Sequence, residues 1–214
     1  MMRWVASLIA AMFISTTSWA ESTPPMEGID YQLVTPAQPT STGDKIEVVE
    51  LFWYGCPHCF QLEPLLNKWK AEGKPANAEF VRIPASLNPK WELHARAYYA
   101  AEVLGILDKS HEALFDAMHA QKKRMNTEEE LAEFHAGFGV SASDFRNAMH
   151  SFAVETKVRR AKQLSERYGI TGVPMLIVNG KYRTGATLTG SNEALLNVVN
   201  ALIEKESGDS KAKQ

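Results

Sequence analysis

An apolar segment that runs directly into a Cys-Pro-His-Cys motif constrains this chain more than any other feature. Residues 48–54 are mostly β-branched or aromatic, as in a buried strand, and Gly55 permits a sharp turn after them. Pro57 suits the first turn of a helix, and apolar residues recur at helical spacing as far as Trp69. The sequence therefore predicts strand, turn and helix, with Cys56 at or just before the helix N-terminus.

A cysteine at a helix N-terminus favours redox chemistry. Unpaired backbone N–H groups and the helix dipole stabilise the Cys56 thiolate, and a protonated His58 adds a positive charge nearby. Because Pro57 holds the turn that brings Cys59 under Cys56, we expect Cys56 to attack and Cys59 to resolve. A stabilised thiolate favours the dithiol over the disulfide, so the predicted direction is disulfide donation.

Two other uses of the cysteine pair fit the sequence less well. A structural disulfide would restrict the unfolded chain little across so short a loop. A zinc site needs about four ligands, and the sequence has no second cysteine pair and no metal-ligand spacing among its other histidines. We expect no metal, and we interpret those histidines as surface or partly buried helix residues: His94, His111, His119, His135 and His150.

Glu50 interrupts the apolar strand. Either it faces solvent at a strand edge, or it is a buried carboxylate beneath the cysteine pair. A buried carboxylate would have a raised pKa and could take up or release the proton of Cys59. The residue pattern leaves both alternatives open.

The N-terminus predicts export. Residues 1–20 carry one positive charge at Arg3, an apolar run up to Ile14, and small residues at Ser18 and Ala20. This pattern predicts a signal peptide cleaved after Ala20; the alternative, a retained membrane anchor, fits less well because the apolar run is short. Loss of Arg3 from the 23 basic residues leaves 22 against 25 acidic ones, a balance that argues against nucleic acid as a partner. In an oxidising compartment, a lone cysteine pair is expected to act on other proteins.

The remaining patterns alternate between strands and helices. Residues 77–83 predict a second strand, parallel to the first because a helix separates the two. Residues 87–166 are helical in pattern, with a capping box formed by Thr127 and Glu130. Residues 31–34 predict a short strand.

The C-terminal part predicts a hairpin and a closing helix. Strands at 175–178 and 181–183 flank an Asn-Gly turn, and Ser191 caps a helix through residue 203, after which we expect fraying. Pro174 opens this hairpin without an N–H for the sheet, so it needs either a cis bond or a trans turn. The sequence does not choose between them.

These motifs together carry a family resemblance. The Cys-Pro-His-Cys motif on a strand–helix junction, with Thr171-Gly172-Val173-Pro174 before a later hairpin, resembles the thioredoxin superfamily. The Pro-His dipeptide, the helical insertion and the signal peptide are similar to those of the DsbA family of periplasmic thiol:disulfide interchange proteins.

The resemblance implies a fold and a set of domains. We expect an α/β thioredoxin fold with a helical domain inserted between its βαβ and ββα halves. The expected divisions are a signal peptide at 1–20, thioredoxin-like parts at 21–84 and 166–206, a helical domain at 85–165 and a frayed tail at 207–214.

The resemblance also implies a site. Cys56 matches the exposed nucleophile and Cys59 the buried cysteine of a redox disulfide, with His58 tuning its oxidising power. Gly172, Val173 and Pro174 match a cis-proline loop that receives an extended substrate. Glu50 matches the family's buried acid. The family often places a lysine beside this acid; Arg82 occupies that region here, but its position is offset and we do not assign it to the site.

The expected function is oxidation of reduced, newly exported proteins through a mixed disulfide at Cys56. The resemblance implies a monomer in the periplasm, a DsbB-like membrane protein that reoxidises it, and no metal or organic cofactor. Two rivals are an isomerase or reductase, which would need a dimerisation domain, and a periplasmic peptide-binding or chaperone module with an inert disulfide.

Overall fold

The structure is a computed structural model that describes residues 24–211. The expected signal peptide, residues 1–20, therefore lies outside the described residues. Within the described part of the chain, no helix is both long enough and apolar enough to cross a bilayer.

A five-stranded sheet forms the centre of the fold. Its strand order is β1 (Gln32–Leu33), β5 (Tyr182–Thr184), β4 (Met175–Val178), β2 (Ile46–Phe52) and β3 (Ala78–Pro84). Every residue of β2 is buried, Glu47 and Glu50 as well as the apolar residues. β2 pairs with β3 in parallel, which confirms the predicted βαβ unit, and with β4 antiparallel. β4 pairs antiparallel with β5, which confirms the predicted hairpin. The hairpin turns through Asn179 and Gly180, both with positive φ, as a type I′ turn requires.

Helices follow the expected segments closely. They are α1 (Pro57–Lys68) with its π-helical continuation η1 (Trp69–Gly73), α2 (Pro89–Val103), α3 (Leu107–His119), α4 (Glu128–Ala136), α5 (Ala142–Met149), α6 (Phe152–Arg167), α7 (Ala186–Thr189) and α8 (Asn192–Lys211). The predicted capping box is present at α4, because the Thr127 hydroxyl accepts from the Glu130 N–H while the Glu130 carboxylate accepts from the Thr127 N–H.

Two expectations about helical residues were wrong. The last helix does not end near residue 203, since α8 continues to Lys211. Three histidines that we expected to be surface or partly buried residues are buried: His94, His111 and His135. Helical periodicity alone did not reveal this, because an imidazole can be buried where its ring nitrogen is hydrogen-bonded and its ring packs on aromatic side chains.

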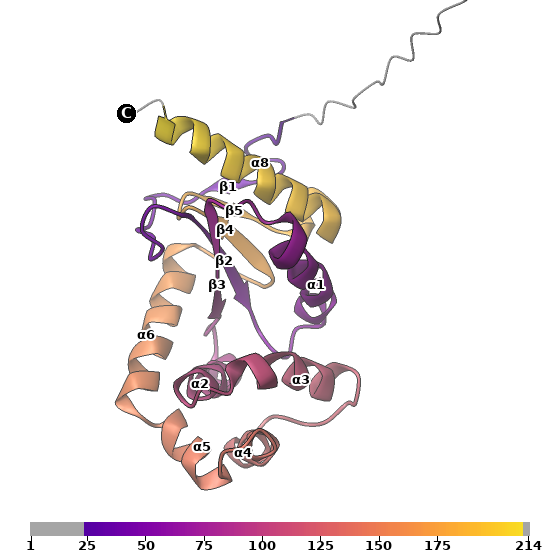
Figure 1. Cartoon of the computed structure of the whole chain (residues 1–214), viewed down its shortest axis with the longest axis vertical. Coiled ribbons are helices and arrows are strands. Elements are labelled where there is room, and N and C mark those ends of the chain that lie inside the picture. Colours follow the sequence, from indigo (N-terminus) through magenta and orange to yellow (C-terminus); the bar gives the residue numbers. More distant parts are fainter. Residues whose placement is uncertain (1–23, 212–214) are drawn as a thin grey trace, which may run out of the picture.

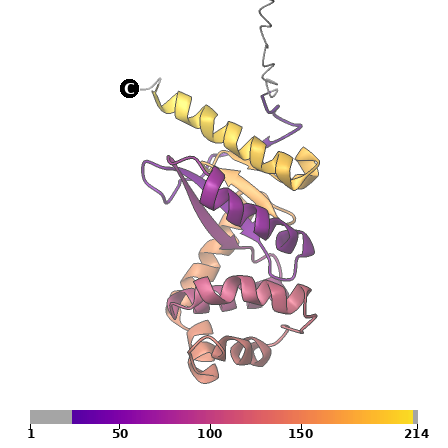
Figure 2. The same ribbon diagram turned by 45° about the vertical axis from the view of Figure 1, so that its right-hand side comes forward.

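The sheet and the helices α2 to α5 meet at the carboxyl end of β2. Figure 1 shows α2 to α5 beyond that end of the sheet, with α6 leading back along it and α8 across the opposite end. The view in Figure 2 keeps α1 beside the sheet and above α3. We call α2 to α6 the helical segment. One cluster of buried side chains joins the sheet to this helical segment, and a second lies between the sheet, α1 and α8. The strand–helix turn after β2 therefore lies where the helical segment meets the sheet.

Candidate active site

The turn after β2 presents the two cysteines at the start of α1. Cys56 is the N-cap residue in an extended conformation, its N–H donates to the Trp53 carbonyl at 2.9 Å, and Pro57 occupies the first helical turn. Cys56 retains 7% of its exposure, whereas Cys59, one turn later, retains none. Both cysteines are free thiols, so the structure shows the dithiol form. Both sulfurs are thus largely covered, and Cys56 is the less covered of the two.

The surroundings of Cys56 favour its thiolate. A hydrogen bond from the Cys59 thiol, then the backbone N–H groups of Cys59 and His58, lower the pKa of Cys56 from 9.0 to about 6, against the opposing effect of burial. The charge of His58 contributes less than these hydrogen bonds. Burial raises the pKa of Cys59, so the two thiols have opposite tendencies to ionise.

The predicted proline loop lies directly against the cysteine pair. The Val173–Pro174 peptide bond is cis, which decides the alternative that the sequence left open. The Cys56 thiol donates to the Val173 carbonyl at 3.3 Å. Next to this contact, a cleft of about 390 Å³ is bordered by His58, by residues 171–175 and by parts of α7 and α8. The cleft therefore lies beside Val173, the residue whose carbonyl contacts the reactive sulfur.

Glu50 is buried under the site and belongs to an ionic network. It has no solvent exposure, so the alternative of a solvent-facing strand edge is excluded. Arg82 Nε donates to Glu50 at 2.9 Å, and Arg82 Nη2 donates to Glu63 at 2.5 Å. Burial, followed by the charge of Glu63, raises the pKa of Glu50 to about 7, although Arg82 lowers it. The charge of Glu50 in turn raises the pKa of Cys59.

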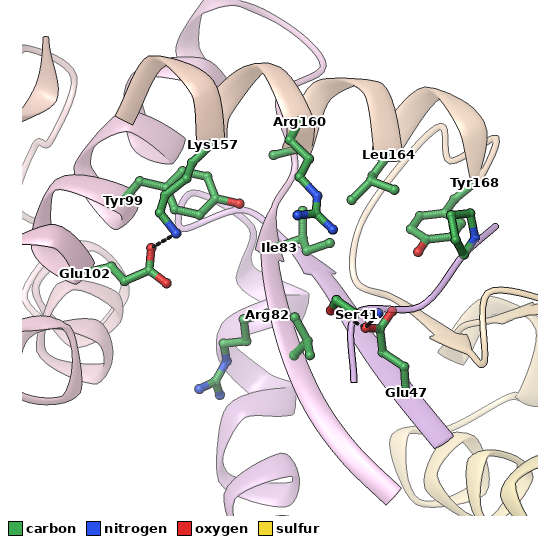
Figure 3. Close-up of a pocket in the computed structure, with 13 residues that line it drawn as sticks. Ser41, Glu47, Arg82, Ile83, Tyr99, Glu102, Lys157, Arg160, Leu164 and Tyr168 are labelled. Atoms are coloured by element: carbon green, nitrogen blue, oxygen red, sulfur yellow. Dashed lines mark hydrogen bonds and ion pairs between the residues drawn. The ribbon is translucent and has the colours of Figure 1, made fainter. Parts of the chain in front are cut away.

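The sequence left Arg82 unassigned because its position seemed offset from Glu50, and the structure shows no such offset. In the parallel register of β2 and β3, Arg82 stands directly opposite Glu50. A groove of about 180 Å³ lies between β3 and α6 and is bordered by Arg160 and Tyr168. Figure 3 shows that the Arg82 guanidinium points away from both of these residues. The side chain therefore crosses to the α1 side of the sheet. The register between β2 and β3 depends on how the two strands pair, which the sequence of either strand does not specify. The sequence therefore did not show that Arg82 stands opposite Glu50.

Two further residues of the network were missed. Glu63 follows Cys59 by one helical turn, so helical spacing could have placed it on the same face of α1. His111 on α3 lies 3.4 Å from Glu63 through Nε2, and burial lowers its pKa to about 3. No local signal marks His111, because its partners come from distant elements.

Comparison with known proteins agrees with this geometry. Residues 47–195 match the family model described as a DSBA-like thioredoxin domain. The chain is 40% identical over 208 residues to the thiol:disulfide interchange protein DsbA of Pseudomonas syringae pv. tomato, covering 97% of this chain and 96% of that protein. It is 42% identical to the protein of the same name from Pseudomonas aeruginosa, over 84% of each chain.

Solved structures show the same likeness in three dimensions. The crystal structure of Pseudomonas aeruginosa DsbA superposes with a TM-score of 0.82 at 40% identity, covering 87% of this chain and 97% of that one. The oxidoreductase NmDsbA1 from Neisseria meningitidis gives a TM-score of 0.75 at 26% identity, over 87% and 96%. The chain belongs to the DsbA-like thioredoxin domain family and is a thiol:disulfide oxidoreductase, a protein dithiol oxidase that works through the Cys56–Cys59 pair.

Proposed function

We propose that this chain oxidises reduced, newly exported proteins by attack of their thiolates on Cys56. A substrate thiolate bonds to Cys56 Sγ, the Cys56–Cys59 bond breaks, and its electron pair leaves on Cys59, which takes up a proton. A second substrate thiolate then attacks the substrate sulfur of this mixed disulfide and releases the Cys56 thiolate. The substrate loses two electrons and the cysteine pair gains them. The observation that carries the proposal is the lowered pKa of Cys56, which makes it the better leaving group and favours the dithiol product.

The surrounding residues divide this work. Pro57 forms the first turn of α1, and His58 contributes its backbone N–H and its charge at Cys56. Glu50 exchanges a proton with Cys59. A pKa of about 7 suits Glu50 for both directions of that transfer near neutral pH.

The proline loop receives the substrate backbone. Gly172, Val173 and Pro174 border the cleft beside Cys56, and an extended peptide laid there places its own cysteine next to the reactive sulfur. Main-chain pairing of this kind accepts many sequences, as an oxidase of diverse clients requires.

We also assign a location, a partner and a domain division. The pattern of residues 1–20 supports cleavage after Ala20 and a periplasmic protein, and the family supports a DsbB-like membrane reoxidant for a monomeric enzyme. The helices from α2 to α6 between β3 and β4 support a helical domain at 85–165, inserted between thioredoxin-like parts at 21–84 and 166–206.

Equilibration with glutathione tests the direction of the reaction. We expect a weakly reducing mixture of glutathione and its disulfide to reduce the pair, as followed by tryptophan fluorescence. We also expect the Cys56 thiolate absorbance to persist well below neutral pH. A pair that stays oxidised until conditions are strongly reducing, with an ordinary thiol pKa, contradicts disulfide donation.

A trapping experiment separates the enzyme from a peptide-binding module with an inert disulfide. Cys59→Ser is first converted to its mixed disulfide between Cys56 and glutathione, so that a thiolate of a reduced, unfolded protein can bond to Cys56 while glutathione leaves. The variant lacks the thiol that would release the substrate from Cys56, so mixed disulfides with the unfolded protein should accumulate. Cys56→Ser is the matched control and should trap nothing. Equal, non-covalent binding by both variants would favour the binding module.

A further inference from the structure

Tyr54, two residues before Cys56, is held at both ends by the helical segment. Its side chain is 1% exposed, and it follows directly on Trp53, whose carbonyl accepts the Cys56 N–H. Two hydrogen bonds, one at the Tyr54 hydroxyl and one at its backbone carbonyl, come from α3, which is distant in sequence but lies next to α1. Residues of the helical segment therefore fix the position of the turn that carries the cysteines, although they lie outside the sheet and α1.

The first anchor is His111. The Tyr54 hydroxyl donates to His111 Nδ1 at 2.8 Å, and His111 Nε2 faces the Glu63 carboxylate at 3.4 Å. This bond fixes the side chain of Tyr54 and ties it to the acid network below Cys59. The hydrogen bond to His111 does not involve the backbone of the turn.

The second anchor is His119, two helical turns further along α3. His119 Nε2 donates to the backbone carbonyl of Tyr54 at 2.7 Å. The same imidazole stacks on the ring of Phe60, with centroids 5.0 Å apart and planes 13° apart. Tyr54 precedes the Cys-Pro-His-Cys motif and Phe60 directly follows it. One side chain thus bridges the two flanks of the reactive turn.

We propose that His119 is a positioning residue for the redox centre, which holds the strand and helix flanks of the cysteine turn together by binding the Tyr54 carbonyl and stacking on Phe60. This inference rests on the proposed disulfide donation. It gives the inserted helices a part in the chemistry, since α3 then helps to set how strongly the cysteine pair oxidises. His119 touches neither sulfur in this arrangement.

The physical link runs through the geometry at Cys56. The contacts that favour its thiolate are a hydrogen bond from Cys59 and two backbone N–H groups, all of which depend on the fixed path from β2 into α1. Loosening either flank lengthens these contacts, which weakens the thiolate and shifts the pair toward the disulfide. Loss of one hydrogen bond or one ring stack corresponds to a change of about two- to tenfold in an equilibrium constant.

Two substitutions separate the contacts of His119. His119→Phe keeps a ring for Phe60 and loses the donor, while His119→Gln keeps an amide donor and loses the ring. For each variant, the glutathione equilibrium constant and the thiolate absorbance against pH are measured beside the wild type. We expect both variants to show a raised Cys56 pKa and an equilibrium shifted about two- to tenfold toward the disulfide.

His135 offers a matched control in the same helical segment. Its Nδ1 bonds to the carbonyl of Leu131 at 2.7 Å, and its ring stacks on Phe145 with centroids 4.0 Å apart. It therefore has the same two kinds of contact without touching the cysteine turn. We expect His135→Phe and His135→Gln to lower the thermal midpoint of both redox forms equally and to leave the glutathione equilibrium unchanged.

The outcomes are separable. If both His119 variants keep the wild-type pKa and equilibrium constant while losing thermal stability, as the His135 variants do, the proposal is overturned. If His119→Phe does not fold, His119→Gln and the difference in thermal midpoint between its oxidised and reduced forms decide the matter. The wild-type equilibrium by itself tests disulfide donation, so failure of the proposed function is seen before any variant is made.

Discussion

At the scale of single residues, the site depends on environments that move the pKa values of nearby groups in opposite directions. Hydrogen bonds lower the pKa of Cys56, whereas burial raises that of Glu50. At neutral pH the sulfur is therefore largely ionised, and the carboxyl group is divided between its two forms. The Cys56 sulfur can therefore leave as an anion, and the Glu50 carboxyl group can exchange a proton with Cys59.

Glu50→Gln tests the buried acid through stability. Its folded pKa of about 7 lies above its ordinary value of 4.5, so proton binding stabilises the fold at low pH, and this contribution is lost as pH rises through about 7. Glutamine does not titrate. We expect the free energy of unfolding of the variant, relative to wild type, to increase by about 1–3 kcal/mol from pH 5 to pH 8. Urea unfolding of both proteins in the disulfide form measures this, and a constant difference would contradict it.

Arg82→Met tests the partner of both buried acids. The substitution leaves Glu50 and Glu63 without their shared cation, which should cost about 3–5 kcal/mol at pH 8. The cost should shrink at pH 5, because both carboxyl groups have raised pKa values and take up protons. Arg159→Met is the control, since that exposed side chain makes only a 3.8 Å ion pair with Glu155. Equal losses for the two variants in urea unfolding would refute the network.

At the scale of elements, the β4–β5 hairpin brings a distant segment close to its turn. Gly180 has φ of 65°, and its carbonyl accepts from the Gln38 N–H at 2.9 Å. A Cβ atom on Gly180 would overlap the Gln38 backbone carbonyl. The glycine thus serves both the turn and the close packing of the segment that contains Gln38.

Gly180→Ala and Gly190→Ala separate these two roles. Gly190 also has positive φ, but a Cβ atom there meets nothing within 4 Å. We expect Gly190→Ala to cost about 1–2 kcal/mol through backbone strain alone. Gly180→Ala should cost about 2–3 kcal/mol more, because the backbone of Gln38 must move. Chemical denaturation of both variants measures these losses. Equal losses in the free energy of unfolding would show that overlap with the Gln38 backbone adds no cost.

At the scale of the whole molecule, the redox state of one turn should change the stability of the entire chain. The folded pKa of Cys56 lies below its ordinary value of 9.0, so its ionisation stabilises the dithiol form above pH 9. That contribution is lost as pH falls through about 6. The disulfide form has no such thiol, and Glu50 titrates in both forms.

We therefore expect the dithiol form to unfold at higher urea than the disulfide form at pH 8. The gap in free energy should narrow by about 1–3 kcal/mol at pH 5, a range that allows for solvent screening at the mouth of the site. Parallel unfolding of the two redox forms measures the gap. The reduced Cys56→Ser variant should lack this pH dependence, and a gap that is independent of pH would argue against the lowered thiol pKa.

Much of the molecule was predictable because the relevant signals are local. Apolar runs, the capping box at Thr127 and the Asn-Gly turn each specify their element through neighbouring residues, and the structure has those elements within a few residues of the expected bounds. The cysteine pair and its place at a helix N-terminus were likewise evident, since strand, turn and motif are contiguous. The family resemblance extended this to the overall fold.

Long-range pairing decided what the sequence left open. The register of β2 and β3 puts Arg82 opposite Glu50, and the approach of the proline loop puts the Val173 carbonyl against Cys56. The contacts of His111 and His119 with Tyr54 likewise depend on where α3 docks. In each case the partners are far apart along the chain, and their geometry is fixed only when the sheet and the helical segment pack together. The sequence by itself determined the reactive motif and its local elements, whereas the tertiary structure decided which charges, carbonyls and rings surround it.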